Sequence, residues 1–149
     1  MNANDFMKIA LEEAEIAANE GEVPVGAVIV KNGKIIARAR NNRESTNDAT
    51  GHAEILVIRQ ACAVLNGWHL EDCSLYVTLE PCPMCMGAII NSRMGNVYYG
   101  AKDAKAGACE SVLNMCSYPL NHKPNVEGGF MKKECADILS KFFKEKRKS

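Results

Sequence analysis

The sequence predicts an α/β fold in which strands and helices alternate within one domain. Short apolar runs of strand length alternate with longer segments of helical periodicity, an order typical of layered α/β sheets. A chain of 149 residues can bury a core of its own, so we expect a single domain over residues 1–149. Two short polar signatures, around His52 and Cys82, fall near predicted strand ends, where ligands of such sheets bind.

The first half of the chain predicts a helix, a β-hairpin and a second helix. Apolar residues recur at helical spacing until Gly21, and Asn2 or Asn4 can cap the start of this helix. Asn32-Gly33 is a hairpin signal between two apolar runs. The expected elements are a helix ending at Gly21, strands at Val25–Val30 and Lys34–Ala39, a loop at Arg40–Gly51 and a helix at Ala53–Leu65. The polar loop indicates either plain turn chemistry or substrate contacts.

The second half predicts a third and a fourth strand around a helix, followed by loops, a last strand and a last helix. The expected elements are strands at Leu75–Leu79 and Val97–Tyr99, a helix at Met84–Ile90, a loop at Ala101–Gly107, a short helix near Ser111–Met115, turns at Ser117–Pro124, a strand at Asn125–Glu127 and a helix from Lys132. The helices Ala53–Leu65 and Met84–Ile90 are apolar nearly all round, which indicates burial on more than one side. We therefore expect them to pack on the sheet and on a second subunit.

Composition and charge indicate a cytoplasmic protein without a membrane segment. The chain has seven cysteines, an odd number, and shows neither a signal peptide nor a long apolar run. Its formal net charge is zero, but residues 132–149 carry seven Lys or Arg against three acidic residues, a net charge of +4. Phe142-Phe143 precede the basic end. Aromatic and basic side chains together suit RNA, and a solvated terminus is the alternative interpretation.

The spacing of Cys82 and Cys85 predicts a metal centre. If Pro83 opens a helix, both sulfur atoms face the same side of its first turn, and the helix N-terminus lowers the pKa of the thiols. His52 can be a third ligand. Three nitrogen and sulfur ligands leave a tetrahedral zinc ion with one open position, which is typical of a catalytic site.

Glu54 lies two residues after His52 and predicts a general base beside the metal. At a helix end both side chains can reach an ion beyond the helix axis, and a carboxylate there can take a proton from water. The alternative is a structural site with four protein ligands, completed by another cysteine, by His69 or by His122. The paired His-x-Glu and Pro-Cys-x-x-Cys signatures favour catalysis.

Together these residues resemble the cytidine-deaminase-like superfamily, and more narrowly the bacterial tRNA-specific adenosine deaminases. The resemblance spans almost the entire chain. The narrower resemblance depends on Glu22-Val23-Pro24-Val25-Gly26-Ala27-Val28, Asn42-Arg43, Thr78-Leu79-Glu80-Pro81-Cys82, Gly100-Ala101-Lys102-Asp103-Ala104-Lys105-Ala106-Gly107 and the Phe-Phe-basic ending. The sequence departs from the family pattern at Ala49, where a proline is usual, and at Gly51, where an alanine is usual. We expect Gly51 to loosen the loop before His52.

The resemblance implies a three-layer α/β/α fold with a five-stranded mixed sheet whose last two strands are parallel. It implies a homodimer with one Zn²⁺ ion per subunit and the anticodon stem-loop of a tRNA as substrate. The implied reaction is the hydrolytic deamination of adenosine to inosine at the wobble position, with release of ammonia.

The resemblance also implies roles for individual residues. His52, Cys82 and Cys85 would hold the zinc ion, and Glu54 would transfer protons between water, the adenine ring and the leaving amino group. The implied substrate contacts are Asn42 to the flipped base, Val25, Leu79 and the backbone N–H of Ala53 around the base, and Asp103, Lys105, Phe143, Lys144 and Arg147 along the anticodon loop.

Two other functions fit part of the same sequence. A deaminase of a free base or nucleoside, such as guanine or cytosine, would share every metal residue, but it would not need the basic aromatic ending or the loop with Asp103 and Lys105. A non-catalytic, zinc-stabilised RNA-binding module would have no use for Glu54 beside an open metal position.

Overall fold

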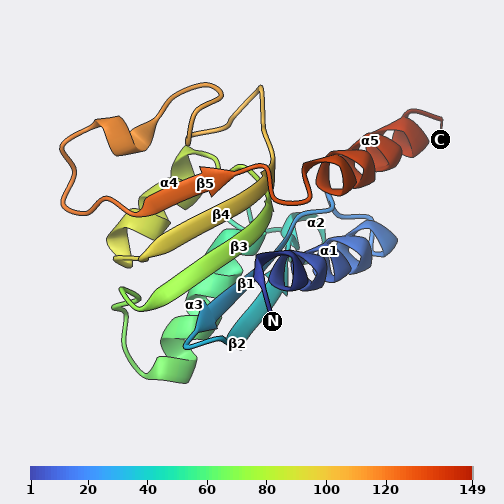
Figure 1. The fold of residues 1–149 in the computed structure, drawn as a ribbon. Helices are drawn as coiled ribbons and strands as arrows, with labels where there is room; N and C mark the ends of the chain where they lie inside the picture. The colour runs from blue at the N-terminus through green and yellow to red at the C-terminus, as the bar shows by residue number, and fades with distance from the viewer. Residues whose placement is uncertain (149) are drawn as a thin grey trace.

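A computed structural model describes residues 1–148 and contains a five-stranded mixed sheet between two layers of helices (Figure 1). The strands are β1 (Gly26–Lys31), β2 (Lys34–Arg40), β3 (Cys73–Leu79), β4 (Asn96–Ala101) and β5 (Asn125–Gly128), in the order β2-β1-β3-β4-β5. β1 is antiparallel to β2 and β3, whereas β3, β4 and β5 run parallel. The predicted architecture is confirmed, including the parallel last pair. Ser149, at the end of the predicted domain, lies outside the described residues.

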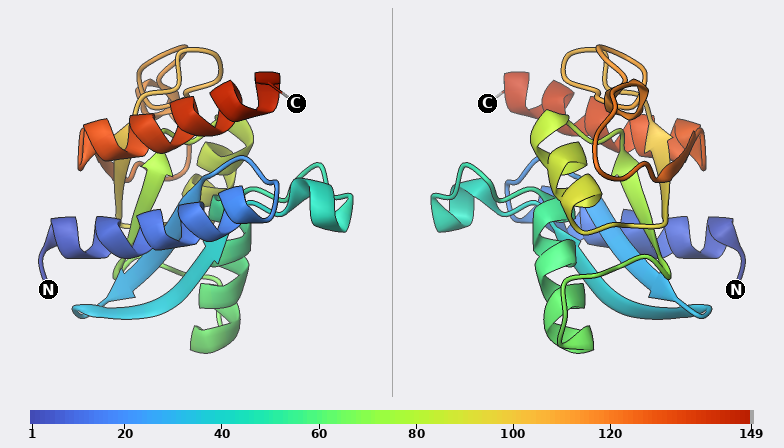
Figure 2. Two further views of the ribbon diagram at one scale, coloured as in Figure 1. Left: turned by 90° about the vertical axis from the view of Figure 1, so that its right-hand side faces the viewer. Right: turned by 90° about the vertical axis from the view of Figure 1, so that its left-hand side faces the viewer.

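The helices cover both faces of the sheet. They are α1 (Ala3–Asn19), the short α2 (Arg43–Thr46), α3 (Ala53–Leu65), α4 (Pro83–Asn91) and α5 (Lys132–Lys148), with a 3₁₀ turn at Met115–Ser117. Figure 2 shows α1 and α5 crossing one face while α3 and α4 lie on the other. None of the helices within residues 1–148 is long and apolar enough to cross a membrane.

The interior strand β1 is apolar from Gly26 to Val30 because both of its faces are buried there. Ala27 and Ile29 belong to the core that includes α3 and α4, whereas Val28 and Val30 face the core under α1 and α5. In the neighbouring strand, Val77 pairs with Ala27. The continuous apolar run that predicted a buried strand therefore reflects alternation between two cores.

Local signals set the ends of the first elements. Asn2 caps α1: its side chain accepts the N–H of Asp5 at 3.0 Å, and the Asp5 carboxylate accepts the N–H of Asn2 at 2.8 Å. Asn2, not Asn4, is therefore the cap. At the hairpin, Asn32 and Gly33 have φ angles of 52° and 75°, which is the left-handed geometry that this turn requires.

Two segments differ from the prediction, and long-range contacts explain both. The expected loop Arg40–Gly51 contains α2, whose first N–H groups donate to the distant carboxylate of Glu22. The expected helix near Ser111–Met115 is wrong: turns lead instead to the 3₁₀ turn Met115–Ser117. The N–H groups of residues 109–111 donate to Glu80, and those of Val112, Leu113 and Met115 donate to carbonyl groups five to seven residues earlier, which is not the i→i−4 pattern of an α-helix.

Candidate active site

Two helices begin at the same point and bring the predicted metal ligands together. His52 is the N-cap residue of α3, and Cys82 is the N-cap residue of α4, with Pro83 in its first turn as predicted. The Nδ1 atom of His52 lies 3.7 Å from the Sγ atom of Cys82 and 3.5 Å from that of Cys85. Ligands held at about 2.0–2.3 Å by a tetrahedral zinc ion lie roughly 3.5–3.8 Å apart. The three side chains therefore fit zinc.

The protonation of the two thiols supports this interpretation. A hydrogen bond from Cys85 and the nearby His52 lower the pKa of Cys82 to about 4, so Cys82 is a thiolate at neutral pH. The same hydrogen bond to Cys82, together with burial, raises the pKa of Cys85. Of the two sulfur atoms, that of Cys85 thus keeps its proton and donates it in the hydrogen bond to the Cys82 thiolate. A metal ion would displace it, as is usual when thiolates become ligands.

The other candidate ligands lie elsewhere. His69 contacts Glu71, and the Nε2 atom of His122 lies 2.7 Å from the backbone oxygen of Met94. Within residues 1–148, His52, Cys82 and Cys85 form the only group of three ligating side chains gathered within 4.8 Å. The geometry therefore favours an open site with three protein ligands over a closed site with four.

Glu54 is buried next to this cluster. It lies in the first turn of α3, only 4% of its surface is exposed, and it lines the same pocket as His52 and Cys82. Burial raises the pKa of Glu54 to about 7. A carboxyl group with that pKa can accept and return a proton near neutral pH.

A pocket of about 220 Å³ opens in front of the cluster. Its walls come from the segment before β1, the end of β3 and the segments after β2 and β4, with the starts of α3 and α4 at the cluster. The lining residues are Val23, Val25, Asn41, Arg43, His52, Glu54, Leu79, Glu80, Cys82, Asp103 and Ala106. Val25 and Leu79 line it, as the resemblance implied for the base pocket, and so does Asp103, which was expected along the anticodon loop. Pockets for drug-sized ligands measure about 300–1,000 Å³, so this pocket suits a single base.

The structure places Asn41, rather than the predicted Asn42, in this pocket. The Oδ1 atom of Asn41 accepts the N–H of Ala53 at 2.7 Å. Asn42 occupies the N-cap position of α2, without a capping hydrogen bond from its side chain, and lines a separate hollow with Arg40. Consecutive side chains after a strand point to opposite sides, so a shift of one residue reverses the direction. The N–H of Ala53 therefore holds Asn41 instead of shaping the base pocket directly.

Gly51 does not loosen the loop before His52. It is buried, its N–H donates to Asp48, and its carbonyl accepts the N–H of Asn42 at 3.0 Å. A Cβ atom at this position would lie 2.5 Å from the Oδ1 atom of Asn42. The sequence thus departs from the family pattern at a position where a side chain would collide with that of Asn42.

Two buried acids that the sequence analysis did not single out hold the pocket walls. Glu22 accepts the N–H groups of Glu44 and Ser45 at 3.0 and 2.8 Å, and Glu80 accepts four backbone N–H groups on the opposite wall. Burial alone would raise the pKa of both acids, but these hydrogen bonds outweigh it and lower the pKa. For Glu80, its place directly after an apolar strand was the available signal.

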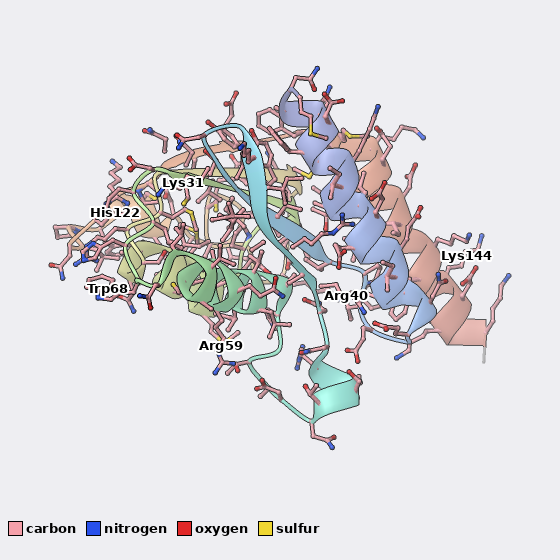
Figure 3. The ribbon with its side chains drawn as sticks, turned by 90° about the horizontal axis from the view of Figure 1, so that it is seen from below. Lys31, Arg40, Arg59, Trp68, His122 and Lys144 are labelled. Carbon is pink, nitrogen blue, oxygen red and sulfur yellow. The ribbon has the colours of Figure 1, made fainter. Side chains whose placement is uncertain are left out.

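The basic C-terminal end lies next to the second wall. Lys105 shares a shallow hollow of about 360 Å³ with Phe143, Lys146 and Arg147 of α5. Lys105, Phe143 and Arg147 were predicted together, and Lys146 was missed. The predicted Lys144 does not line this hollow, although it lies on the same helix, α5 (Figure 3).

Known deaminases match the chain along nearly its whole length. The profile of the MafB19-like deaminase family matches residues 1–147. The tRNA-specific adenosine deaminase of Bacillus subtilis (strain 168) is 49% identical over 144 residues, which cover 96% of this chain and 89% of the relative.

Solved structures agree with this match. One, from a study of A-to-I editing by tRNA:A34 deaminases at the wobble position of transfer RNA, has a TM-score of 0.88 at 48% identity, over 91% of this chain and 99% of that chain. A guanine deaminase from Bacillus subtilis has a TM-score of 0.66 at 39% identity, over 81% and 88% of the two chains. On sequence, fold and site together, the chain belongs to the tRNA-specific adenosine deaminases, a family with the cytidine-deaminase-like fold.

Proposed function

We propose that the protein catalyses the hydrolytic deamination of adenosine to inosine at the wobble position of a tRNA anticodon. The observation that carries the proposal is a pocket the size of one base that contains a His-Cys-Cys group and a buried carboxyl group. Relatives at about half identity over nearly the whole chain bear the name of this activity. In the reaction, water and adenosine give inosine and ammonia.

Zinc is the cofactor that the three ligating side chains suit best, with one ion per chain. His52, Cys82 and Cys85 would hold it. A zinc ion with three protein ligands keeps a position open and lowers the pKa of water there, which supplies the nucleophile for hydrolysis. The soft thiolates and the imidazole nitrogen favour zinc over Mg²⁺ or Ca²⁺.

Glu54 transfers the protons of the reaction. Its carboxylate takes a proton from the attacking water and delivers it to the adenine ring nitrogen next to carbon 6. It then takes the second proton of the water and passes it to the amino group, which leaves as ammonia. A pKa near 7 suits both directions of transfer.

Asn41 orients the base. Because the Ala53 N–H occupies its Oδ1 atom, its side-chain NH₂ group remains to donate to an acceptor nitrogen of the purine. Val25 and Leu79 supply apolar contacts to the base. The base must leave its stack to enter the pocket, at a cost that is smaller in an anticodon loop than in a duplex.

The hollow at Lys105, Phe143, Lys146 and Arg147 suits the RNA beyond the target base. Cations can neutralise backbone phosphates, and Phe143, which is 43% exposed, offers a surface for an unstacked base. A deaminase of free guanine would need neither feature. With a tRNA as its substrate, the protein would act in the cytoplasm.

The protein would act as a homodimer. α3 and α4 bury one side against the sheet, but Val64 and Met84 on them remain 61% and 37% exposed. A second subunit would cover this apolar surface. Multi-angle light scattering should give twice the mass of the chain, and a monomer at micromolar concentration would contradict the dimer.

The function is tested by measuring ammonia release from three substrates with the zinc-loaded protein. An anticodon stem-loop with adenosine at the wobble position should react, and the same stem-loop with guanosine there is the matched control. Free adenosine and free guanine are the other two substrates. Turnover of free guanine with none of the stem-loop would overturn the proposal in favour of the activity of the guanine deaminase relative.

A further inference from the structure

We propose that Glu80 is a positioning residue that fixes the substrate loop, residues 102–111, against the segment that carries Cys82 and Cys85. Glu80 follows the last residue of β3, and its side chain is only 1% exposed. The loop leaves the end of β4 and passes beside α5 (Figure 2). The RNA part of this inference rests on the proposed function.

The carboxylate of Glu80 accepts hydrogen bonds from five donors of the loop. Its Oε1 atom accepts the N–H of Asp103 at 3.1 Å and the hydroxyl of Ser111. Its Oε2 atom accepts the N–H groups of Cys109, Glu110 and Ser111 at 3.0, 2.8 and 3.0 Å. These donors come from both ends of the loop, so a single side chain closes it.

Packing adds to these hydrogen bonds at Gly107. A Cβ atom on this residue would lie 2.4 Å from the Cδ atom of Glu80, closer than real contacts allow. The absence of a side chain therefore lets the loop close over the carboxylate. Hydrogen bonds to Glu80 thus hold the two ends of the loop, and the close packing of Gly107 against the same side chain holds its middle.

The loop so placed carries both the wall of the pocket and the hollow beside it. Asp103 and Ala106 line the pocket, and Lys105 lies in the hollow with Arg147. The Oδ1 atom of Asp103 accepts the N–H groups of Lys105 and Ala106, which fixes the tip of the loop. A shift of the loop would move all three contacts together.

The same loop is tied to the metal segment. The N–H of Ala108 donates to the carbonyl of Pro81 at 2.8 Å, and the N–H of Glu80 itself donates to Ala101 at 2.8 Å. Glu80 therefore stands between the residues that hold the metal and the residues that face the RNA. Its position sets the distance between the reacting base and the rest of the substrate.

An ionised carboxyl group is required because every partner is a donor. A glutamine has nearly the same shape but replaces one acceptor oxygen with an NH₂ group. In either orientation this group would face at least one backbone N–H of the loop, which would lose its buried partner.

The first test compares Glu80→Gln with Glu13→Gln. Glu13 is also a buried acid, 5% exposed, but it pairs with Arg38 and Arg40 away from the pocket. We expect Glu80→Gln to raise KM for the stem-loop about tenfold or more, with zinc content near one per chain. Glu13→Gln should lower the melting temperature without changing KM. If Glu80→Gln only lowers the melting temperature, or if it loses zinc, the positioning role is wrong.

A second variant displaces the loop by a different means. Gly107→Ala keeps the carboxylate and its charge but inserts a methyl group against it. It should raise KM in the same direction as Glu80→Gln, because both variants move Asp103 and Lys105. An unchanged KM in the folded Gly107→Ala protein would contradict the inference.

Hydrogen exchange separates this inference from the proposed function. The amides of Asp103, Cys109, Glu110 and Ser111 should lose protection in Glu80→Gln, while the amides of β1 keep it. This result does not depend on turnover. A wild-type protein that is inactive on the stem-loop would overturn the proposed function, whereas retained protection of the four amides would overturn the role of Glu80.

Discussion

The metal cluster and the pocket walls are built in different ways. The ligands and Glu54 sit at the N-termini of α3 and α4, two helices that pack into the core of the sheet. Much of the walls consists of the segments after β2 and β4, whose positions depend on the distant carboxylates of Glu22 and Glu80. The proposed reacting groups thus belong to helices packed in the core, whereas many of the proposed substrate contacts belong to the segments that these carboxylates hold.

Burial follows the same division. Cys85 is fully buried and Glu54 nearly so, whereas Phe143 is 43% exposed and Lys105 and Arg147 are also exposed. Changes in the cluster should therefore abolish chemistry, and changes at the outer wall should alter binding and its salt dependence. The following predictions test this division, beginning with the largest effect.

Loss of a ligand should remove both metal and activity. In Cys85→Ser, a hydroxyl replaces a buried thiol, and a hydroxyl is a poor zinc ligand. We expect zinc content well below one per chain, measured by atomic emission, and no detectable turnover. Cys62→Ser changes a partly buried thiol outside the cluster and serves as the control. A fully active Cys85→Ser protein would contradict the assignment of Cys85.

Glu54→Gln should remove proton transfer and leave the metal cluster intact. Without a base, kcat should fall by about 10²–10⁴, whereas zinc content and the affinity for the stem-loop should stay near those of the wild type. Single-turnover measurement of inosine formation gives the rate directly. Near-normal turnover would show that another group transfers the protons.

Removing cations from the outer wall should weaken RNA binding without affecting chemistry. In the double variant Lys105→Ala/Arg147→Ala, the slope of log affinity against log salt should decrease by about 2, with kcat unchanged. Lys144→Ala removes a cation from the same helix outside the hollow, and its effect should be smaller. Equal effects of Lys144→Ala and Arg147→Ala would favour a solvated terminus without a specific site.

The smallest expected effect concerns Glu22 and acid stability. Hydrogen bonds from Glu44 and Ser45 lower the pKa of Glu22 in the folded state, despite its burial. Its contribution to the free energy of unfolding is therefore present above the unfolded pKa of about 4.3 and disappears as pH falls through the lower folded value. Melting temperatures should show that Glu22→Gln is less stable than the wild type at pH 7 and that the difference shrinks towards pH 3.

Exposed Glu15→Gln is the control for that experiment. Its melting temperature should follow that of the wild type over the whole range. A difference between Glu22→Gln and the wild type that stays constant with pH would show that the loop does not depend on the charge of Glu22.

Much of the chemistry could be predicted because its signals are local. Cys82 and Cys85 are three residues apart, so the first turn of a helix brings both to one side. His52 and Glu54 are two residues apart, and at the end of a helix both can reach a point beyond its axis. The order of strands and helices follows from apolar periodicity in the same way. The parallel return of β5 also agrees with the long connection before it.

The walls of the pocket could not be predicted in the same detail because long-range contacts decide them. The choice between Asn41 and Asn42 depends on which side of the chain faces Ala53 twelve residues later. The turns of residues 109–111 depend on Glu80, about thirty residues earlier, which accepts their N–H groups and fixes the path of the chain there. The sequence by itself thus determined the fold class and the reacting groups through local backbone geometry. Only the tertiary structure decided which loop residues face the substrate, because buried carboxylates far away in the chain hold those loops.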